Sequence, residues 1–199
     1  MNVVFDVGRV LLRWEPDLLL GPLTGGAEGL AAFHAEVDFY AWHFQQDNGR
    51  GAAEAVAAAS AAHPAYAPVF EAFYERWLET IPGTVPGSVA VLERLRAREV
   101  PLYAITNFPG AEWRKTVPVY PFLDRFRDVV VSGDVGLTKP DAAIYRLLLE
   151  RNGLAAGDCV FIDDSPPNVA AAKGVGMDAI HFTDAAALEA ALTERGLLG

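Results

Sequence analysis

Short runs of apolar residues, rich in β-branched and aromatic side chains, recur along this chain and alternate in its second half with helix-prone segments. They lie within residues 3–5, 101–106, 127–131, 159–163 and 179–182. In the first run, Val3, Val4 and Phe5 have the β-branched and aromatic character of a strand that is buried on both faces, as in a parallel sheet with helices on either side. The alternation therefore predicts an α/β fold with a doubly wound, Rossmann-like parallel sheet.

The segment between the first two runs, residues 16–82, contains no convincing strand. Helical spacing of apolar residues, or a high alanine content, predicts helices in it at residues 27–46, 52–62 and 69–78. A segment this long exceeds what a simple crossover between two strands needs. We therefore expect a helical domain of residues 16–82, inserted after the first strand of an α/β core formed by residues 1–15 and 83–199.

Polar residues follow several of the predicted strands at the point where each strand ends. Asp6 follows the first strand, Thr106 ends the second, and Asp163 and Asp164 end the run that starts at residue 159. Lys139 lies in the loop after the run at 127–131. Because parallel strands have their carboxyl ends at one edge of the sheet, these side chains are expected to converge there.

Such a set of side chains suits phosphoryl transfer. A carboxylate that attacks phosphorus must overcome repulsion between two anions, which requires a divalent cation and a fixed positive side chain. Asp6 and Asp164 are candidate Mg²⁺ ligands, and Lys139 and Thr106 are candidate partners of the phosphoryl oxygens. Asp6 would form an aspartyl-phosphate that water then hydrolyses. Taken singly, each residue also fits a structural role, such as a helix cap or a surface charge.

With these residues the chain resembles the haloacid dehalogenase-like superfamily over nearly its whole length. The resemblance rests on segments that look like the four motifs of that superfamily, in the same order: Phe5-Asp6-Val7-Gly8-Arg9-Val10, Ile105-Thr106-Asn107, Lys139-Pro140-Asp141-Ala142-Ala143-Ile144-Tyr145 and Phe161-Ile162-Asp163-Asp164-Ser165-Pro166-Pro167-Asn168-Val169. The helical segment 16–82 stands where the cap domain of the superfamily is inserted. It is therefore expected to close over the site and to select the substrate.

The resemblance also implies roles for single residues. Asp6 would be the nucleophile, with Lys139 as a second catalytic residue. Substrate phosphate would be bound by Thr106, Asn107 and Lys139. The metal ligands would be Asp6, the backbone carbonyl of Gly8, and Asp164, with Asp163 and Asn168 in support.

Gly8 is the departure from this pattern. Phosphatases of the superfamily generally carry a second Asp two residues after the nucleophile, and glycine can neither protonate a leaving group nor activate water. A subgroup of sugar-phosphatase-like members resembles this chain in having Gly there. His34, His43 and Asp47 of the helical segment are candidates for the missing acid, although each also fits a surface or packing role.

The function expected from these observations is Mg²⁺-dependent hydrolysis of a small phosphorylated metabolite, with sugar phosphates among the candidates. One alternative is a 2-haloacid dehalogenase-type hydrolase that uses the same Asp nucleophile. Dehalogenases of the superfamily, however, lack an acidic pair like Asp163-Asp164 and typically have Tyr in place of Gly8. Another alternative is a catalytically weak, ligand-binding relative.

Charge and hydropathy limit the other partners. The formal net charge of −10, from 26 acidic and 16 basic residues, argues against binding nucleic acid through a broad basic face. Asp6 and Arg9 interrupt the apolar start of the chain, which argues against a signal peptide, and no uncharged apolar stretch of transmembrane length follows. We therefore expect a cytoplasmic protein without a membrane partner, either a monomer or a homodimer.

Overall fold

The computed structural model describes all residues, 1–199, and contains a five-stranded sheet in the order β3-β2-β1-β4-β5. Every pair of neighbouring strands is parallel. The strands are β1 (Asn2–Phe5), β2 (Leu102–Thr106), β3 (Asp128–Val131), β4 (Cys159–Asp163) and β5 (Asp178–His181). The predicted parallel α/β architecture is thereby confirmed.

Strand β1 is the central strand, and its side chains alternate between the two faces of the sheet. Val3 and Phe5 pack in one hydrophobic cluster with helices α6 (Ser88–Ala97) and α11 (Ala185–Glu194). Val4 packs in a second cluster, with helices α9 (Ala142–Asn152) and α10 (Pro166–Gly174). Helices therefore cover both faces, which explains why the middle of each strand is apolar on both faces.

The remaining α-helices of the α/β part are α7 (Gly110–Thr116) and α8 (Ser132–Val135), and it also contains the 3₁₀ helices η3 (Val117–Val119), η4 (Pro121–Arg125) and η5 (Ala156–Asp158). Helix α8 is a single short turn directly after β3 that the sequence did not predict. The loop between α8 and α9 runs along the carboxyl edge of the sheet and carries Lys139. This edge is where β1, β2 and β4 end, so it is the position at which their terminal polar residues meet.

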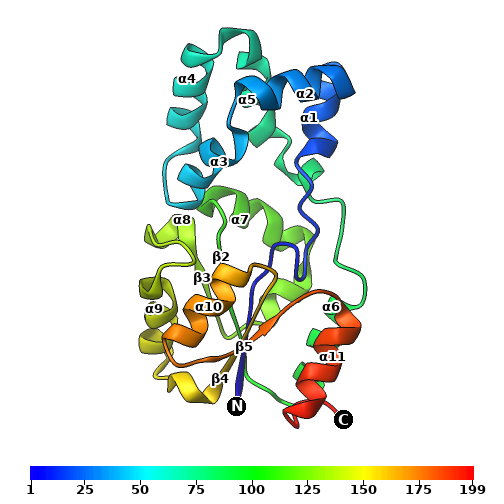
Figure 1. The fold of residues 1–199 in the computed structure, drawn as a ribbon, viewed down its shortest axis with the longest axis vertical. Helices are drawn as coiled ribbons and strands as arrows, with labels where there is room; N and C mark the ends of the chain where they lie inside the picture. The colour runs from blue at the N-terminus through cyan, green and yellow to red at the C-terminus, as the bar shows by residue number, and fades with distance from the viewer.

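Residues 16–82, called the helical insertion below, separate β1 from β2 and lie beyond the carboxyl edge of the sheet, at the top of Figure 1. They contain helices α1 (Asp17–Leu23), α2 (Ala27–Glu36), α3 (Phe39–Asp47), α4 (Ala52–Ala62) and α5 (Ala67–Glu75), and the 3₁₀ helix η2 (Trp77–Thr80). Aromatic side chains, including Phe33, Phe39 and Phe73, fill their common core. That core continues into Val7 and Phe108 of the α/β part.

The stretch expected to be helical from 27 to 46 is divided into two helices. Val37 has extended backbone angles, φ −112° and ψ 119°. The Asp38 carboxylate then accepts a hydrogen bond from the Ala41 amide at 3.1 Å and caps the next helix. The capping side chain offers the chain an alternative to a continuous helix. The break starts helix α3, which carries His43 near its middle and Asp47 at its end.

Hydrogen bonds connect the helical insertion to the α/β part. The Ser132 hydroxyl, at the start of α8, donates to the Asp47 carbonyl at 2.6 Å. The Trp77 indole donates to the Thr116 hydroxyl at 3.1 Å, and both residues are buried. These contacts hold the end of α3 against α8 and the start of η2 against α7.

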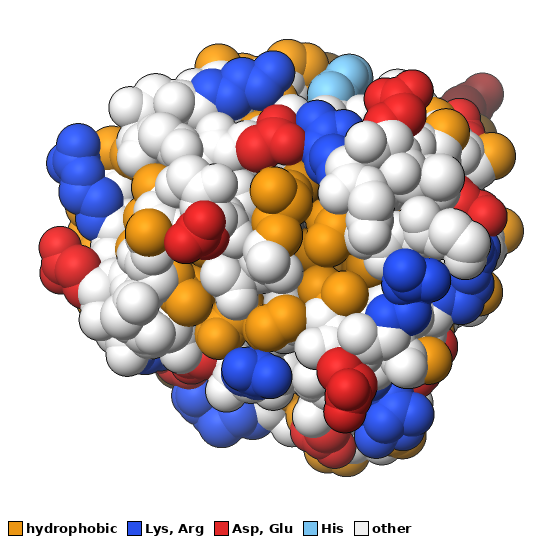
Figure 2. Space-filling view, turned by 90° about the horizontal axis from the view of Figure 1, so that it is seen from below, with side chains coloured by type: hydrophobic (Ala, Val, Ile, Leu, Met, Phe, Trp, Pro, Cys, Tyr) orange, Lys and Arg blue, Asp and Glu red, His pale blue; other side chains and the backbone are white.

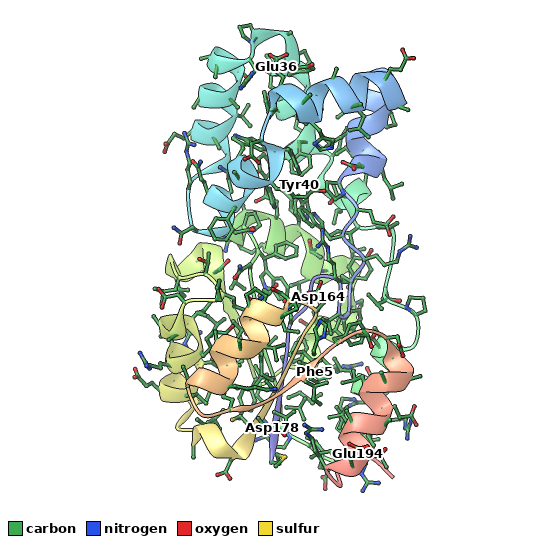
Figure 3. All side chains as sticks on the ribbon, in the orientation of Figure 1. Phe5, Glu36, Tyr40, Asp164, Asp178 and Glu194 are labelled. Atoms are coloured by element: carbon green, nitrogen blue, oxygen red, sulfur yellow. The ribbon has the colours of Figure 1, made fainter.

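The opposite end of the molecule holds both chain termini (Figure 1). Figure 2 views the molecule from that end, where acidic and basic side chains are interspersed among hydrophobic ones. In Figure 3, Asp178 and Glu194 lie toward this end, whereas Asp164 lies at the edge that faces the helical insertion. None of the helices has the length and apolar character required to cross a membrane.

Candidate active site

Lys139 is the centre of a buried charge cluster at the carboxyl edge of the sheet. Its ammonium Nζ lies 2.8 Å from Asp6 Oδ1 and 2.7 Å from Asp163 Oδ2. All three side chains are buried, and Lys139 is only 2% exposed. Burial lowers the pKa of Lys139, but the neighbouring Asp6 and Asp163 raise it more, so the ammonium stays charged.

Asp163 and Asp164 are adjacent in sequence but have different surroundings. Both Asp163 oxygens are occupied, because they contact Lys139, accept from the Asn168 amide at 3.0 and 3.1 Å, and accept from the Ser165 N–H at 2.8 Å. The Asp164 carboxylate is half-buried, forms no ion pair and lines a cavity. Asp163 therefore holds the site together, whereas Asp164 is available to a ligand.

Asp6 is held at one of its two carboxylate oxygens. Oδ1 accepts the Val7 N–H at 2.6 Å and contacts Lys139, whereas Oδ2 has no hydrogen-bond partner in the protein. Burial raises the pKa of Asp6 to about 7; Lys139 opposes this shift, and Asp163 and Asp164 add to it. Oδ2 is thus the oxygen that remains for a metal ion or for attack on a substrate.

The three carboxylates form a group that fits a hard divalent cation. Asp6, Asp163 and Asp164 each contribute one oxygen, and these oxygens lie within 4.8 Å of one another. Only one ammonium group, that of Lys139, pairs with this cluster, and it contacts Asp6 and Asp163 but not Asp164. Burial, followed by the charge of Asp163, raises the pKa of Asp164. Oxygen ligands with excess negative charge are what Mg²⁺ prefers in proteins.

Thr106 and Asn107 lie at the end of β2 and have different partners. The Thr106 hydroxyl is buried and has no hydrogen-bond partner, which is unusual for a polar atom in this position. The Asn107 side chain accepts from the Lys139 backbone N–H at 2.9 Å and donates to the Lys139 carbonyl at 3.0 Å. The Thr106 hydroxyl therefore has an unused hydrogen bond, although Thr106 does not line the cavity described below, whereas the Asn107 amide fixes the backbone that carries Lys139.

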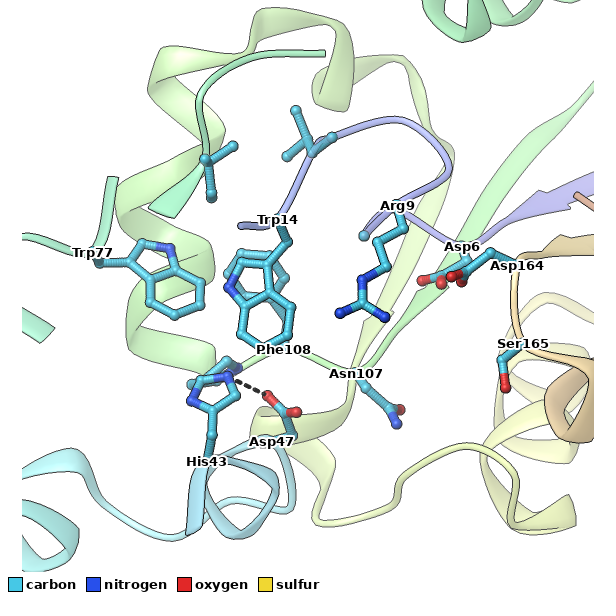
Figure 4. A pocket seen from close by; sticks show the side chains of 14 residues that line it. Asp6, Arg9, Trp14, His43, Asp47, Trp77, Asn107, Phe108, Asp164 and Ser165 are labelled. Atoms are coloured by element: carbon cyan, nitrogen blue, oxygen red, sulfur yellow. Dashed lines mark ion pairs between the residues drawn. The ribbon is translucent and has the colours of Figure 1, made fainter. Parts of the chain in front are cut away.

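A cavity of about 210 Å³ lies between the carboxyl edge of the sheet and the helical insertion (Figure 4). Its polar wall is formed by Asp6, Gly8, Asp164 and Ser165, together with Asn107, Arg9 and Asp47. Apolar and aromatic side chains form the remainder: Leu12, Trp14, His43, Trp77, Ile81, Phe108 and Pro109. The cavity thus joins the acidic cluster to an aromatic wall supplied in part by the insertion.

Two of the three acid candidates from the insertion reach this cavity. His43 and Asp47 line it, whereas His34 lies elsewhere and contacts Asp17 Oδ1 at 2.9 Å. The His43 ring is buried, and its centroid lies 5.1 Å from that of Trp14 in a stacked arrangement. Burial lowers the pKa of His43 to about 3, so its imidazole is neutral at neutral pH.

Arg9 and Trp14 line the cavity and were not singled out from the sequence. The Arg9 guanidinium lies 5.6 Å from the centroid of the Trp14 ring, and Figure 4 shows it between Trp14 and Asp6. Arg9 has a φ of 59°, which is uncommon for a residue with a side chain. The only sequence signal was the position of Arg9 beside Gly8. Neither residue type nor spacing indicated that the loop turns back toward Asp6.

The model of the haloacid dehalogenase-like hydrolase family matches residues 7–176 of the chain. A sesquiterpene phosphatase of Aspergillus oryzae is 32% identical over 98 residues, which cover 49% of this chain and 50% of that protein. A phosphoglycolate phosphatase of Rhodospirillum rubrum is 35% identical over 92 residues, covering 46% and 38%. A phosphorylated carbohydrates phosphatase of Thermotoga maritima is 34% identical over 91 residues, covering 45% and 42%. The chain thus spans half or less of the length of these curated relatives.

Solved structures resemble almost the entire chain. A haloacid dehalogenase family enzyme from Bacteroides thetaiotaomicron, solved with magnesium and inorganic phosphate, aligns with a TM-score of 0.73 at 19% identity, covering 92% of this chain and 94% of that one. A predicted hydrolase of the same type from Porphyromonas gingivalis aligns with a TM-score of 0.75 at 20% identity, covering 98% and 96%. At these identities the likeness concerns the fold alone.

Proposed function

The chain belongs to the haloacid dehalogenase-like hydrolases, and from this premise we propose that it is an Mg²⁺-dependent phosphomonoester hydrolase that acts through an aspartyl-phosphate on Asp6. The observation that carries the proposal is the contact of Lys139 with both Asp6 and Asp163, beside the free carboxylate of Asp164. Carboxylates and an ammonium in one buried cluster suit the transfer of a phosphoryl group. The phosphatase names of three partial relatives support the same reaction.

In this proposal Asp6, the Gly8 carbonyl and Asp164 hold the Mg²⁺, and Asp163 and Asn168 support them. When bound, Mg²⁺ would lower the repulsion between the attacking carboxylate and the phosphoryl oxygens. Asp163 is less suited to be a ligand, because Lys139, Asn168 and Ser165 already occupy its oxygens.

The residues of the chain would bind and orient the phosphoryl group as follows. Asp6 attacks with Oδ2, because Oδ1 is held by the Val7 N–H and by Lys139. Lys139 has three N–H donors and contacts two carboxylate oxygens, which leaves one donor for a phosphoryl oxygen. The Thr106 hydroxyl, which has no partner in the protein, donates to a second phosphoryl oxygen. Asn107 contributes mainly by positioning Lys139.

We also propose that the helical insertion, residues 16–82, is a cap domain on a core of residues 1–15 and 83–199. It supplies His43, Asp47, Trp77 and Ile81 to the cavity wall. Because this wall is mostly apolar and aromatic, it favours a substrate whose alcohol part has apolar surface over a sugar phosphate with many hydroxyl groups. Both kinds of substrate occur in the names of the partial relatives, a sesquiterpene phosphatase and a phosphorylated carbohydrates phosphatase.

The proposed function is tested by measuring phosphate release from p-nitrophenyl phosphate, a prenyl phosphate and a hexose phosphate, with Mg²⁺ and with EDTA. We expect release only with Mg²⁺, and faster release from the two apolar substrates. The dehalogenase alternative is tested by halide release from 2-chloropropionate in EDTA. Metal-independent halide release without phosphate release would overturn the proposal.

Replacing Asp164 by Ala should weaken the response to Mg²⁺. The substitution removes a carboxylate that has no partner in the protein, so we expect the Mg²⁺ concentration for half-maximal activity to rise by about tenfold or more. Calorimetric titration of Mg²⁺ measures the same change without substrate. Asp158→Ala is the matched control, because Asp158 is an exposed acid directly before β4, whereas Asp164 directly follows β4. Unchanged Mg²⁺ affinity in Asp164→Ala would contradict the assignment.

A further inference from the structure

We infer that Asp47 is the general acid and base of this site: its carboxyl group protonates the leaving oxygen of the substrate and later takes a proton from the attacking water. The inference rests on the proposed function and assigns a role that Gly8 cannot fill. An alkoxide is a poor leaving group unless it receives a proton as the bond to phosphorus breaks. A phosphatase of alkyl phosphates built on Asp6 therefore needs a proton donor on the leaving-group side.

Position is the first argument. In phosphoryl transfer the attacking and leaving oxygens are roughly in line, so the leaving oxygen lies across the cavity from Asp6. Asp6 and Asp164 come from the sheet, whereas Asp47 comes from the last turn of α3 in the helical insertion. Figure 4 shows Asp47 on a different wall of the same cavity from Asp6 and Asp164. Asp47 therefore lies on the side where the alcohol would depart.

The surroundings of Asp47 are the second argument. Its side chain is 13% exposed, and its buried Oδ1 has no hydrogen-bond partner. The nearest basic atom, His43 Nε2, lies 3.6 Å away, which is too long for a hydrogen bond (dashed in Figure 4). A buried carboxyl group without a partner is costly as an anion. Burial accordingly raises the pKa of Asp47 to about 8, with Lys139 opposing and Asp6 adding to the shift.

The other groups on this wall cannot replace Asp47. His43 is neutral, and its Nδ1 lies 3.2 Å from the Tyr74 hydroxyl, which itself donates to Gln46. Trp14, Trp77 and Phe108 carry no group that exchanges protons near neutral pH. The backbone of Asp47 is fixed as well, because its carbonyl accepts from the Ser132 hydroxyl. Asp47 is therefore the one protonated acid held on the leaving-group wall.

The proton balance closes over two steps. In the first, Asp6 Oδ2 forms a bond to phosphorus, the bond from phosphorus to the alcohol oxygen breaks, and the Asp47 proton passes to that oxygen. The alcohol leaves and Asp47 is an anion. In the second, water attacks phosphorus and gives its proton to Asp47, while the bond between phosphorus and Asp6 breaks. Phosphate leaves, and both carboxyl groups return to their starting states.

The test compares two substrates that differ in the basicity of the leaving group: phenylethyl phosphate, an alkyl ester, and p-nitrophenyl phosphate, whose phenolate leaves without needing a proton. For Asp47→Asn we expect kcat/KM for the alkyl ester to fall by at least about 10²-fold. The fold-reduction for the aryl ester should be smaller than this by a factor of at least about ten. Because base assistance to water is also lost, the aryl ester should give a burst of one p-nitrophenolate per enzyme. Asn resembles the neutral acid in shape and charge, so the thermal unfolding midpoint should be maintained.

Asp38→Asn is the matched control, because this residue is the N-cap of α3, lies outside the cavity, and retains a capping side chain as Asn. Equal losses with both esters in Asp47→Asn, or no loss, would overturn the role of Asp47. Loss of the folded state in Asp47→Asn would also count against it, since a neutral isostere should be accepted. If the wild type releases no phosphate from either ester with Mg²⁺, the proposed function itself fails, which is a separate outcome.

Discussion

Asp6→Asn is expected to lower Mg²⁺-dependent phosphate release by about 10⁴-fold or more, because the amide oxygen is a poor nucleophile and the free carboxylate oxygen is lost. The change conserves shape and leaves Lys139 paired with Asp163 at 2.7 Å. The protein should therefore stay folded, and the loss should be catalytic. The measurement is the initial rate of phosphate release at saturating Mg²⁺, together with a thermal unfolding midpoint.

A second readout shows whether Asp6 becomes phosphorylated. Acid-quenched wild-type enzyme, mixed with p-nitrophenyl phosphate, should carry a phosphoryl group on the peptide that contains Asp6, and Asp6→Asn should carry none. Asp158→Asn is the matched control, since this exposed acid lies at the opposite edge of the sheet from Asp6. Equal rates in Asp6→Asn and the wild type would rule out covalent catalysis by Asp6.

Lys139→Met should impair both stability and activity. Asp6 and Asp163 would lose their only cationic partner, and removing one member of a buried charged group typically lowers the free energy of unfolding by about 3–5 kcal/mol. Binding of the phosphoryl group should fail at the same time, because its proposed ammonium donor is absent. Urea denaturation and phosphate-release rates, measured at a temperature at which the variant is folded, separate the two effects.

Lys173→Met serves as the matched control for Lys139→Met. Lys173 lies on α10, is exposed and forms no ion pair, so its replacement should leave both the free energy of unfolding and the rate nearly unchanged. A Lys139→Met protein as stable and as active as the wild type would show that the contacts with Asp6 and Asp163 contribute to neither property.

The fold could be predicted from the sequence because strands that are buried on both faces carry a strong local signal. Residues 159–163 and 52–62 coincide with β4 and α4, since β-branched runs and alanine runs have distinct periodicity and propensity. The division of the expected helix at 27–46 was missed. Its cause, the extended Val37 followed by the Asp38 cap, consists of two residues within an otherwise helical pattern.

The site, too, was predictable from the sequence only in part. Asp6 and Asp163 meet because strand ends of a parallel sheet share one edge, a rule that applies before any coordinate is known. Lys139 reaches them from the loop between α8 and α9. The catalytic roles assigned to them stay predictions until the variants are measured. The sequence could not rank His34, His43 and Asp47, because helical spacing does not say which turn of the insertion faces the sheet.

The sequence by itself thus determined which chemistry is present: acids, a lysine and a threonine at the ends of parallel strands, with a glycine at position 8. Only the tertiary structure decided which residues of the helical insertion line the cavity. In the folded chain, Asp47 and the aromatic side chains line the same cavity as Asp6, whereas His34 lies outside this cavity. Local propensity fixes elements within a few residues, whereas the approach of α3 to the sheet depends on contacts between segments far apart in the chain, such as Ser132 with Asp47.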